Sequence, residues 1–114
     1  MKRGELYRVR HPSGDAKKAR VFVVVSRDDL VQSRFSTVVC APVYTARRGL
    51  STEVFVGAAE GLKHDCAVLC DALVSVRKTA LTRYVGELGD AGLERLGRAL
   101  RIALDAETEG AWEC

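Results

Sequence analysis

The chain has 114 residues, of which 47% are hydrophobic, and a formal net charge of +3. That length buries one modest core, which excludes a second large domain, so we expect a single domain over 1–106 and a flexible tail over 107–114. No run approaches the roughly 20 apolar residues of a membrane span, and no signal-peptide core follows the N-terminus, which predicts a soluble, cytoplasmic protein. Without a secretory signal, we expect the four cysteines to be reduced thiols.

Runs rich in β-branched residues dominate the N-terminal half of the chain. Residues 4–10 predict a half-buried first strand. The run 20–26 is apolar at almost every position, which predicts a central strand covered on both faces. We expect Phe35 to return the chain to the core before 37–44 forms the next strand of the same antiparallel sheet. Pro42 has no N–H to donate, so it is expected at an edge or a bulge near the end of that strand.

The C-terminal half continues the sheet and ends in a helix. Residues 51–56 predict a strand that presents Thr52, Val54 and Val56 on one face, and 84–88 predict a last short strand. The run 66–76 reads as one long apolar strand broken by Asp71, which should be salt-bridged across an interface or belong to a polar site. Asp90 offers an N-cap to a helix with one apolar stripe. The stripe consists of Leu93, Leu96, Leu100, Ala103 and Leu104.

The charges are distributed unevenly along the chain. Up to residue 57 there are 11 Lys and Arg against 5 Asp and Glu, and from residue 58 onward 7 against 10. A basic N-terminal half is what a polyanion-binding face needs. The loop cations that we consider for such a face are Lys17, Lys18, Arg34, Arg47, Arg48 and Arg77. The residues alone therefore predict a small, mainly β (α+β) barrel or sheet with a C-terminal helix and a basic loop face.

Four segments in succession add a family resemblance. They are Arg3-Gly4-Glu5-Leu6-Tyr7, then Arg20 before the apolar run 21–26, then Ala41-Pro42-Val43-Tyr44-Thr45, and finally Gly61-Leu62-Lys63-His64-Asp65-Cys66-Ala67-Val68-Leu69-Cys70-Asp71. Together they resemble the MazF/PemK toxin endoribonucleases, over residues 2 to about 105 and at the spacing of that family.

The resemblance implies a compact SH3-like, CcdB-like antiparallel β-barrel that acts as a homodimer, cleaves single-stranded RNA at short sequence motifs and is neutralised by an antitoxin. In that family an Arg entering the second strand and a Ser or Thr ending the third carry catalysis, and these positions match Arg20 and Thr45. An acidic residue of the preceding loop matches Asp15. The chain departs from the family pattern here, because Asp replaces Glu and no Pro follows Arg20.

Such a sparse site suits RNA, which carries its own nucleophile in the 2′-OH. The enzyme needs to orient that group, stabilise charge on the phosphoryl oxygens and move protons, so neither a metal nor another cofactor is expected. Arg20 can grip a phosphate and Thr45 can donate a hydrogen bond to it. The general base is open among Asp15, a water and the substrate itself. An excess of apolar strand surface predicts a homodimer whose RNA groove crosses the interface, lined by the loop cations.

Two alternatives come from other functional classes. CcdB-type toxins share the general fold but inhibit DNA gyrase by binding it through a C-terminal segment with a Trp, and Trp112 lies near the end of this chain. The second alternative is a non-catalytic RNA-binding barrel, which would use the basic loops but would not need Arg20 and Thr45 to lie together.

Overall fold

The structure is a computed structural model that describes residues 1–10 and 19–106. The strands of its sheet are β1 (Glu5–Val9), β2 (Arg20–Val24), β3 (Thr37–Tyr44), β4 (Glu53–Val56), β5 (Cys66–Leu69), β6 (Val74–Arg77) and β7 (Arg83–Glu87). The helices are α1 (Asp28–Val31) and α2 (Asp90–Ala103), and the 3₁₀ turns are η2 (Ala58–Glu60), η3 (Cys70–Ala72) and η4 (Lys78–Ala80). This arrangement confirms the mainly β fold with a C-terminal helix.

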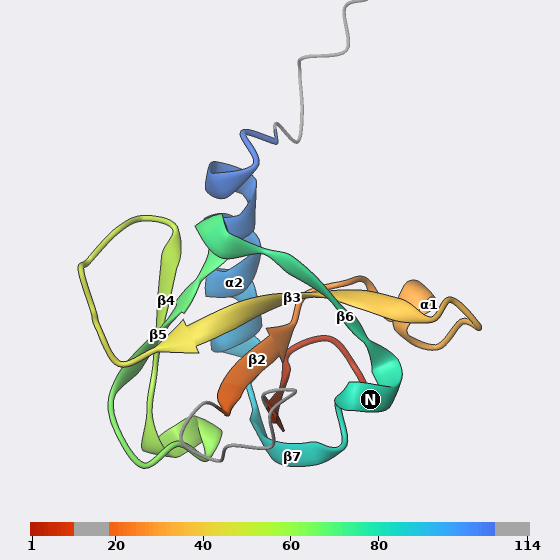
Figure 1. Ribbon diagram of the computed structural model, residues 1–114. Helices are drawn as coiled ribbons and strands as arrows, with labels where there is room; N and C mark the ends of the chain where they lie inside the picture. The colour runs from red at the N-terminus through yellow and green to blue at the C-terminus, as the bar shows by residue number, and fades with distance from the viewer. Residues whose placement is uncertain (11–18, 107–114) are drawn as a thin grey trace, which may run out of the picture.

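Strand β3 is the hub of a curled antiparallel sheet in the order β4-β5-β3-β2-β1-β7 (Figure 1). One side of β3 pairs with β2, and the other side changes partner along its length. Residues 37–40 pair with β6, whereas Val43 and Tyr44 pair with β5. Pro42 lies where the partner changes, inside a central strand and not at an edge, so its missing N–H falls between two ladders.

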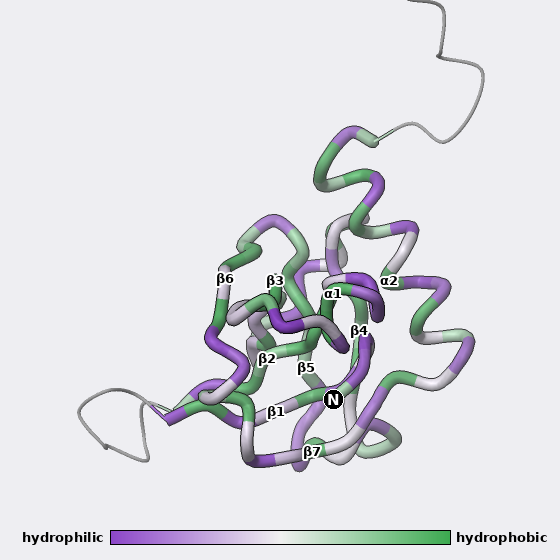
Figure 2. The backbone as a smooth tube through the Cα atoms, turned by 90° about the vertical axis from the view of Figure 1, so that its right-hand side faces the viewer, coloured by the Kyte–Doolittle hydropathy of each residue, from purple (hydrophilic) through white to green (hydrophobic). Residues whose placement is uncertain are grey.

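Apolar side chains cover both faces of the sheet. Helix α2 packs on the larger cluster through Leu96, which is fully buried, and through Leu93 and Leu100. Green and purple alternate along α2 in Figure 2, as expected for a helix with one apolar face. A smaller cluster on the other face includes Tyr7 and Val24. Strand β2 is therefore covered on both faces, as predicted. Val54 and Val56 of β4 are buried, and so is Thr52, which directly precedes that strand.

Several sequence predictions prove wrong. The run 66–76 is two strands joined by η3, and Asp71 is an exposed residue of that turn. An exposed carboxylate needs no counter-charge, and that of Asp71 accepts a hydrogen bond of 2.6 Å from the Thr52 hydroxyl. Phe35 does not enter the core, because 59% of its surface is exposed in the segment before β3. Strand β1 is buried on both faces, since Leu6 and Tyr7 are both covered.

The end residues of α2 also differ from expectation. Gly89 is the N-cap, and Asp90 is the first helical residue, where its charge still favours the positive end of the helix dipole. Leu104 follows the helix and is 61% exposed, so the apolar stripe ends at Ala103. In the part of the chain that the structure describes, no helix is long and apolar enough to span a membrane. The tail over 107–114, with Trp112, lies outside that part.

Candidate active site

Arg20 and Thr45 line one open cavity of about 920 Å³ at the end of the sheet where β2 begins and β3 ends. Because β2 and β3 are antiparallel neighbours, the first residue of one and the residue after the other reach the same end of the sheet. Both side chains are exposed. We call this hollow the Arg20 cavity. The sequence prediction that these two positions come together is consistent with this placement.

The Arg20 guanidinium is held by an aromatic ring. Its Cζ lies 4.4 Å from the centroid of the Tyr44 ring, a distance at which the ring face attracts a cation. No described residue forms an ion pair with Arg20. Among the described residues, its donors are therefore held in position without being neutralised, which suits a group that binds an anion.

Other polar side chains around the Arg20 cavity were not predicted as site residues. They are Arg8 of β1, Lys63 and His64 before β5, and Tyr84 of β7. The described lining contains the cations Arg8, Arg20 and Lys63 and no carboxylate, so the cavity is electropositive. Lys63 and His64 belong to the motif quoted from 61–71, but no feature of the sequence indicates that this segment faces Arg20.

One wall of the cavity depends on contact between two backbones. Gly61 has φ +89°, a left-handed conformation that glycine adopts readily, and it packs against Val85 of β7. A methyl group on Gly86 would overlap the carbonyl oxygen of Glu60 and lie 2.7 Å from its carbon. This contact fixes the turn that leads into Lys63 and His64.

The thiol of Cys66 secures the end of the same wall. It donates a hydrogen bond of 3.3 Å to the backbone carbonyl of His64. Burial raises the pKa of the Cys66 thiol, and the charge of Arg47 acts in the opposite direction. Cys40, Cys66 and Cys70 are all buried free thiols, in line with the prediction of reduced structural cysteines.

The predicted RNA-contacting cations lie in different places. Arg47 is engaged within the protein, 3.7 Å from the Asp65 carboxylate and stacked 4.0 Å from the centroid of the Phe55 ring. The Arg48 backbone N–H donates to Glu53. Arg77 pairs with Thr37 at the start of β3, so it lies at the opposite end of that strand from Thr45.

Arg34, the remaining predicted cation of the described residues, also lies near the start of β3. It is exposed just before β3, on the same side as Arg77, and so a single protomer does not bring either residue to the Arg20 cavity. Asp15, Lys17 and Lys18 lie outside the described residues.

Comparison with known proteins places the chain in a family. Residues 2–104 match the family described as PemK-like, MazF-like toxin of type II toxin-antitoxin system. Endoribonuclease MazF3 of Mycobacterium tuberculosis is 33% identical over 90 residues, which are 79% of this chain and 86% of that protein.

Two solved structures have the same fold. The Mycobacterium tuberculosis toxin MazF-mt6 matches with a TM-score of 0.79 and 28% identity, over 91% of this chain and 99% of that one. A mycobacterial endoribonuclease in complex with its cognate antitoxin also matches with a TM-score of 0.79, at 26% identity, over 96% of this chain and 99% of that one. From the match over residues 2–104 and these relatives, we conclude that the chain belongs to the PemK-like, MazF-like family of toxins from type II toxin–antitoxin systems.

Proposed function

We propose that this chain, an endoribonuclease toxin by family, cleaves single-stranded RNA by attack of a 2′-OH on the adjacent phosphorus. The observation that supports the proposal is the joint presence of Arg20 and Thr45 in one electropositive cavity. The new P–O2′ bond forms as the P–O5′ bond breaks, which leaves a 2′,3′-cyclic phosphate upstream and a 5′-OH downstream. No metal is needed for this reaction, since both the nucleophile and the leaving group belong to the RNA.

Each residue has a defined part in the proposed reaction. Arg20 holds the two non-bridging phosphoryl oxygens and stabilises the charge that develops on them. Thr45 donates a hydrogen bond to the same phosphate. His64 is the described lining residue with an imidazole, which can accept or donate a proton, so it is a candidate for moving a proton from the 2′-OH or to the leaving oxygen. Asp15 stays a candidate for the same task from outside the described residues.

The test measures cleavage of a long RNA by matched variants. Arg20→Ala should lower the rate by on the order of 10²–10³-fold, as the loss of one electrostatic stabiliser does elsewhere. Thr45→Ala should act in the same direction, Thr45→Ser much less, and Arg98→Ala, on the exposed face of α2, not at all. A single deoxynucleotide at the cut should block cleavage, and EDTA should not. Full activity in Arg20→Ala, or cleavage past the deoxynucleotide, would refute the mechanism.

We propose two protein partners. The first is a second copy of the chain, because β6 pairs only with β3 among the described strands and exposes Val74 near its free edge. Phe35 is exposed just before the start of β3 and adds apolar surface at the other end of that edge. Sedimentation at micromolar concentration should give a dimer, and an active monomer would contradict this prediction. The second partner is a cognate antitoxin, by analogy with the mycobacterial relative solved with its own. Both partners and the RNA would be met in the cytoplasm.

A further inference from the structure

A second hollow shares the lining residue Arg8 with the Arg20 cavity. It measures about 360 Å³ and lies between the end of β1, the turn η4 and the start of β7. Its lining residues are Arg8, Val9, Arg10, Thr79, Ala80, Thr82 and Arg83. Three guanidinium groups and two hydroxyls are thus gathered there, and the described lining contains no carboxylate. We call this hollow the Arg83 groove.

The ladder between β1 and β7 places charges of one sign opposite each other at both ends. Glu5 faces Glu87 at one end, and Arg8 faces Arg83 at the other. Side chains directly opposite in an antiparallel pair lie on the same face of the sheet, where like charges repel. An opposite charge near either end of the ladder would offset this repulsion.

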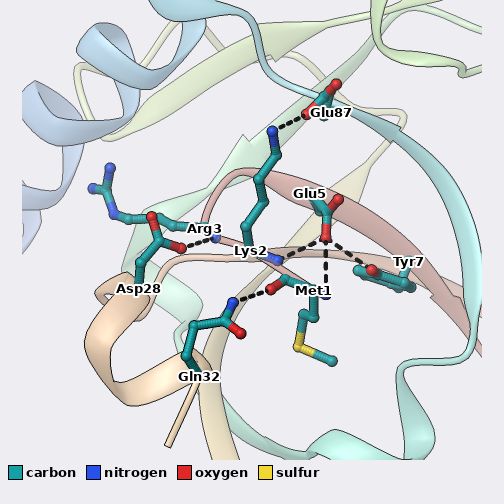
Figure 3. Close-up of polar contacts among 8 residues, drawn as sticks. All are labelled: Met1, Lys2, Arg3, Glu5, Tyr7, Asp28, Gln32 and Glu87. Carbon is teal, nitrogen blue, oxygen red and sulfur yellow. Dashed lines mark hydrogen bonds and ion pairs between the residues drawn. The ribbon is translucent and has the colours of Figure 1, made fainter.

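The acidic end has its counter-charges within the protein, as Figure 3 shows. The Lys2 ammonium lies 3.1 Å from the Glu87 carboxylate, and the N-terminal ammonium lies 3.9 Å from that of Glu5. The hydrogen bond with Glu87 and its charge raise the pKa of Lys2. The basic end has none in the described part of the chain, where neither Arg8, Arg10 nor Arg83 forms an ion pair.

The Arg83 groove and the proposed active site have a lining residue in common. Arg8 lines both hollows, and Tyr84, next to Arg83 in the chain, lines the Arg20 cavity. Tyr84 is 55% exposed, and its ring is held edge-to-face against Tyr7 with 5.8 Å between centroids. An exposed aromatic ring that is held in place beside cations can stack on a base of a single RNA strand.

We propose that the Arg83 groove binds the backbone of the substrate RNA where the strand leaves the Arg20 cavity. Arg8, Arg10 and Arg83 hold phosphates, Thr79 and Thr82 donate hydrogen bonds to them, and Tyr84 stacks on a base that lies in the Arg20 cavity. The inference rests on the proposed function, because it makes the same RNA the occupant of both hollows. The phosphates of the RNA supply the counter-charge that the Arg8–Arg83 pair lacks among the described residues of the protein.

The test separates this groove from the cavity by the length of the ligand. The probes are fluorescent, mixed-sequence 2′-O-methyl RNAs, which lack the reactive 2′-OH: a tetranucleotide, long enough for the Arg20 cavity, and a dodecanucleotide, which reaches the groove. Affinities are measured by fluorescence anisotropy over a series of salt concentrations. The salt slope is the slope of the logarithm of the binding constant against the logarithm of the salt concentration. The Arg10→Ala/Arg83→Ala double variant should reduce its magnitude for the dodecanucleotide by about 0.7 for each lost phosphate contact. The double variant should leave the salt slope for the tetranucleotide unchanged, and Arg98→Ala should change the slope for neither RNA.

A charge reversal keeps the test independent of folding. Arg83→Glu places a carboxylate opposite Arg8, so the variant should melt no lower than the unmodified protein while it binds the dodecanucleotide more weakly. Loss of RNA affinity only together with loss of stability would show a structural role and overturn the proposal.

Two further results would also overturn it. One is an equal loss of affinity for both RNA lengths. The other is that the Arg10→Ala/Arg83→Ala variant keeps the salt slope for RNA but no longer binds a polyglutamate peptide that the unmodified protein binds. That result would identify an acidic protein segment as the ligand. The proposed function fails separately: a protein that cuts no RNA but shows the length-dependent slope would keep the groove and lose the catalytic assignment.

Discussion

Replacing Gly86 by alanine tests how the wall of the Arg20 cavity is built. The new methyl group would overlap the Glu60 carbonyl oxygen and lie 2.7 Å from its carbon, and both are backbone atoms that cannot rotate away. Overpacking against a well-packed neighbour costs about 1–3 kcal/mol, and a backbone obstacle puts Gly86→Ala near the upper figure. In a domain of this size, that loss corresponds to a melting temperature lower by roughly 10–20 °C.

The assay pairs thermal unfolding, followed by circular dichroism, with RNA cleavage at a temperature where the variant is folded. Cleavage should also fall, because the turn that is pushed away from β7 leads directly into Lys63 and His64. The control is Gly97→Ala in α2, where the new methyl would meet only the end of the Arg101 side chain, at 3.5 Å. There alanine should stabilise the helix by about 1 kcal/mol. A Gly86→Ala protein that melts within about 2 °C of the unmodified one would refute the backbone contact between η2 and β7.

Two further predictions concern stability. Burial raises the pKa of Cys40 to about 12 and that of Cys70 to about 11, while an unfolded thiol ionises near pH 9. The unfolded state therefore loses protons first as pH rises, so the stability that is complete below pH 9 should fall by about 1.4 kcal/mol per cysteine at pH 10, measured by urea unfolding. Equal unfolding midpoints at about pH 8 and pH 10 would contradict this. Thr52→Val removes the hydroxyl that donates to Asp71 and should cost about 1 kcal/mol in the same assay, whereas Ser51→Ala should cost almost nothing because Ser51 is exposed.

The sequence predicted best where the pattern of a single run decides the structure. The run 20–26 and the run 37–44 gave neighbouring antiparallel strands because their β-branched residues fit a sheet covered on both faces. That pairing alone explains why Arg20 and Thr45 reach the same end of the sheet. Predicting that Arg20 and Thr45 lie at one end of the sheet therefore needed only local information, whereas their catalytic roles stay a prediction from the family resemblance.

Prediction failed where a distant contact decides the structure. The run 66–76 contains no Gly or Pro, so nothing local marks the break at η3. Thr52 holds the first two residues of this turn: its carbonyl accepts the Cys70 N–H at 3.0 Å, and its hydroxyl donates to Asp71. His64 was missed for the same kind of reason, because it reaches the Arg20 cavity through the pairing of β5 with β3.

The arrangement of β7 links the two hollows through one irregularity. Its ladder with β1 pairs Leu6 with Gly86 and then Tyr7 with Tyr84, so Val85 is an extra residue in the register. In a regular ladder Arg8 would face Tyr84, and the two arginines would not be opposed. The bulge therefore sets Arg8 against Arg83, and it sets Tyr84, which lines the Arg20 cavity, against Tyr7. Gly86 adjoins the bulge and packs against the Glu60 carbonyl. The same few residues therefore position both the wall of the Arg20 cavity that carries His64 and the arginines of the Arg83 groove.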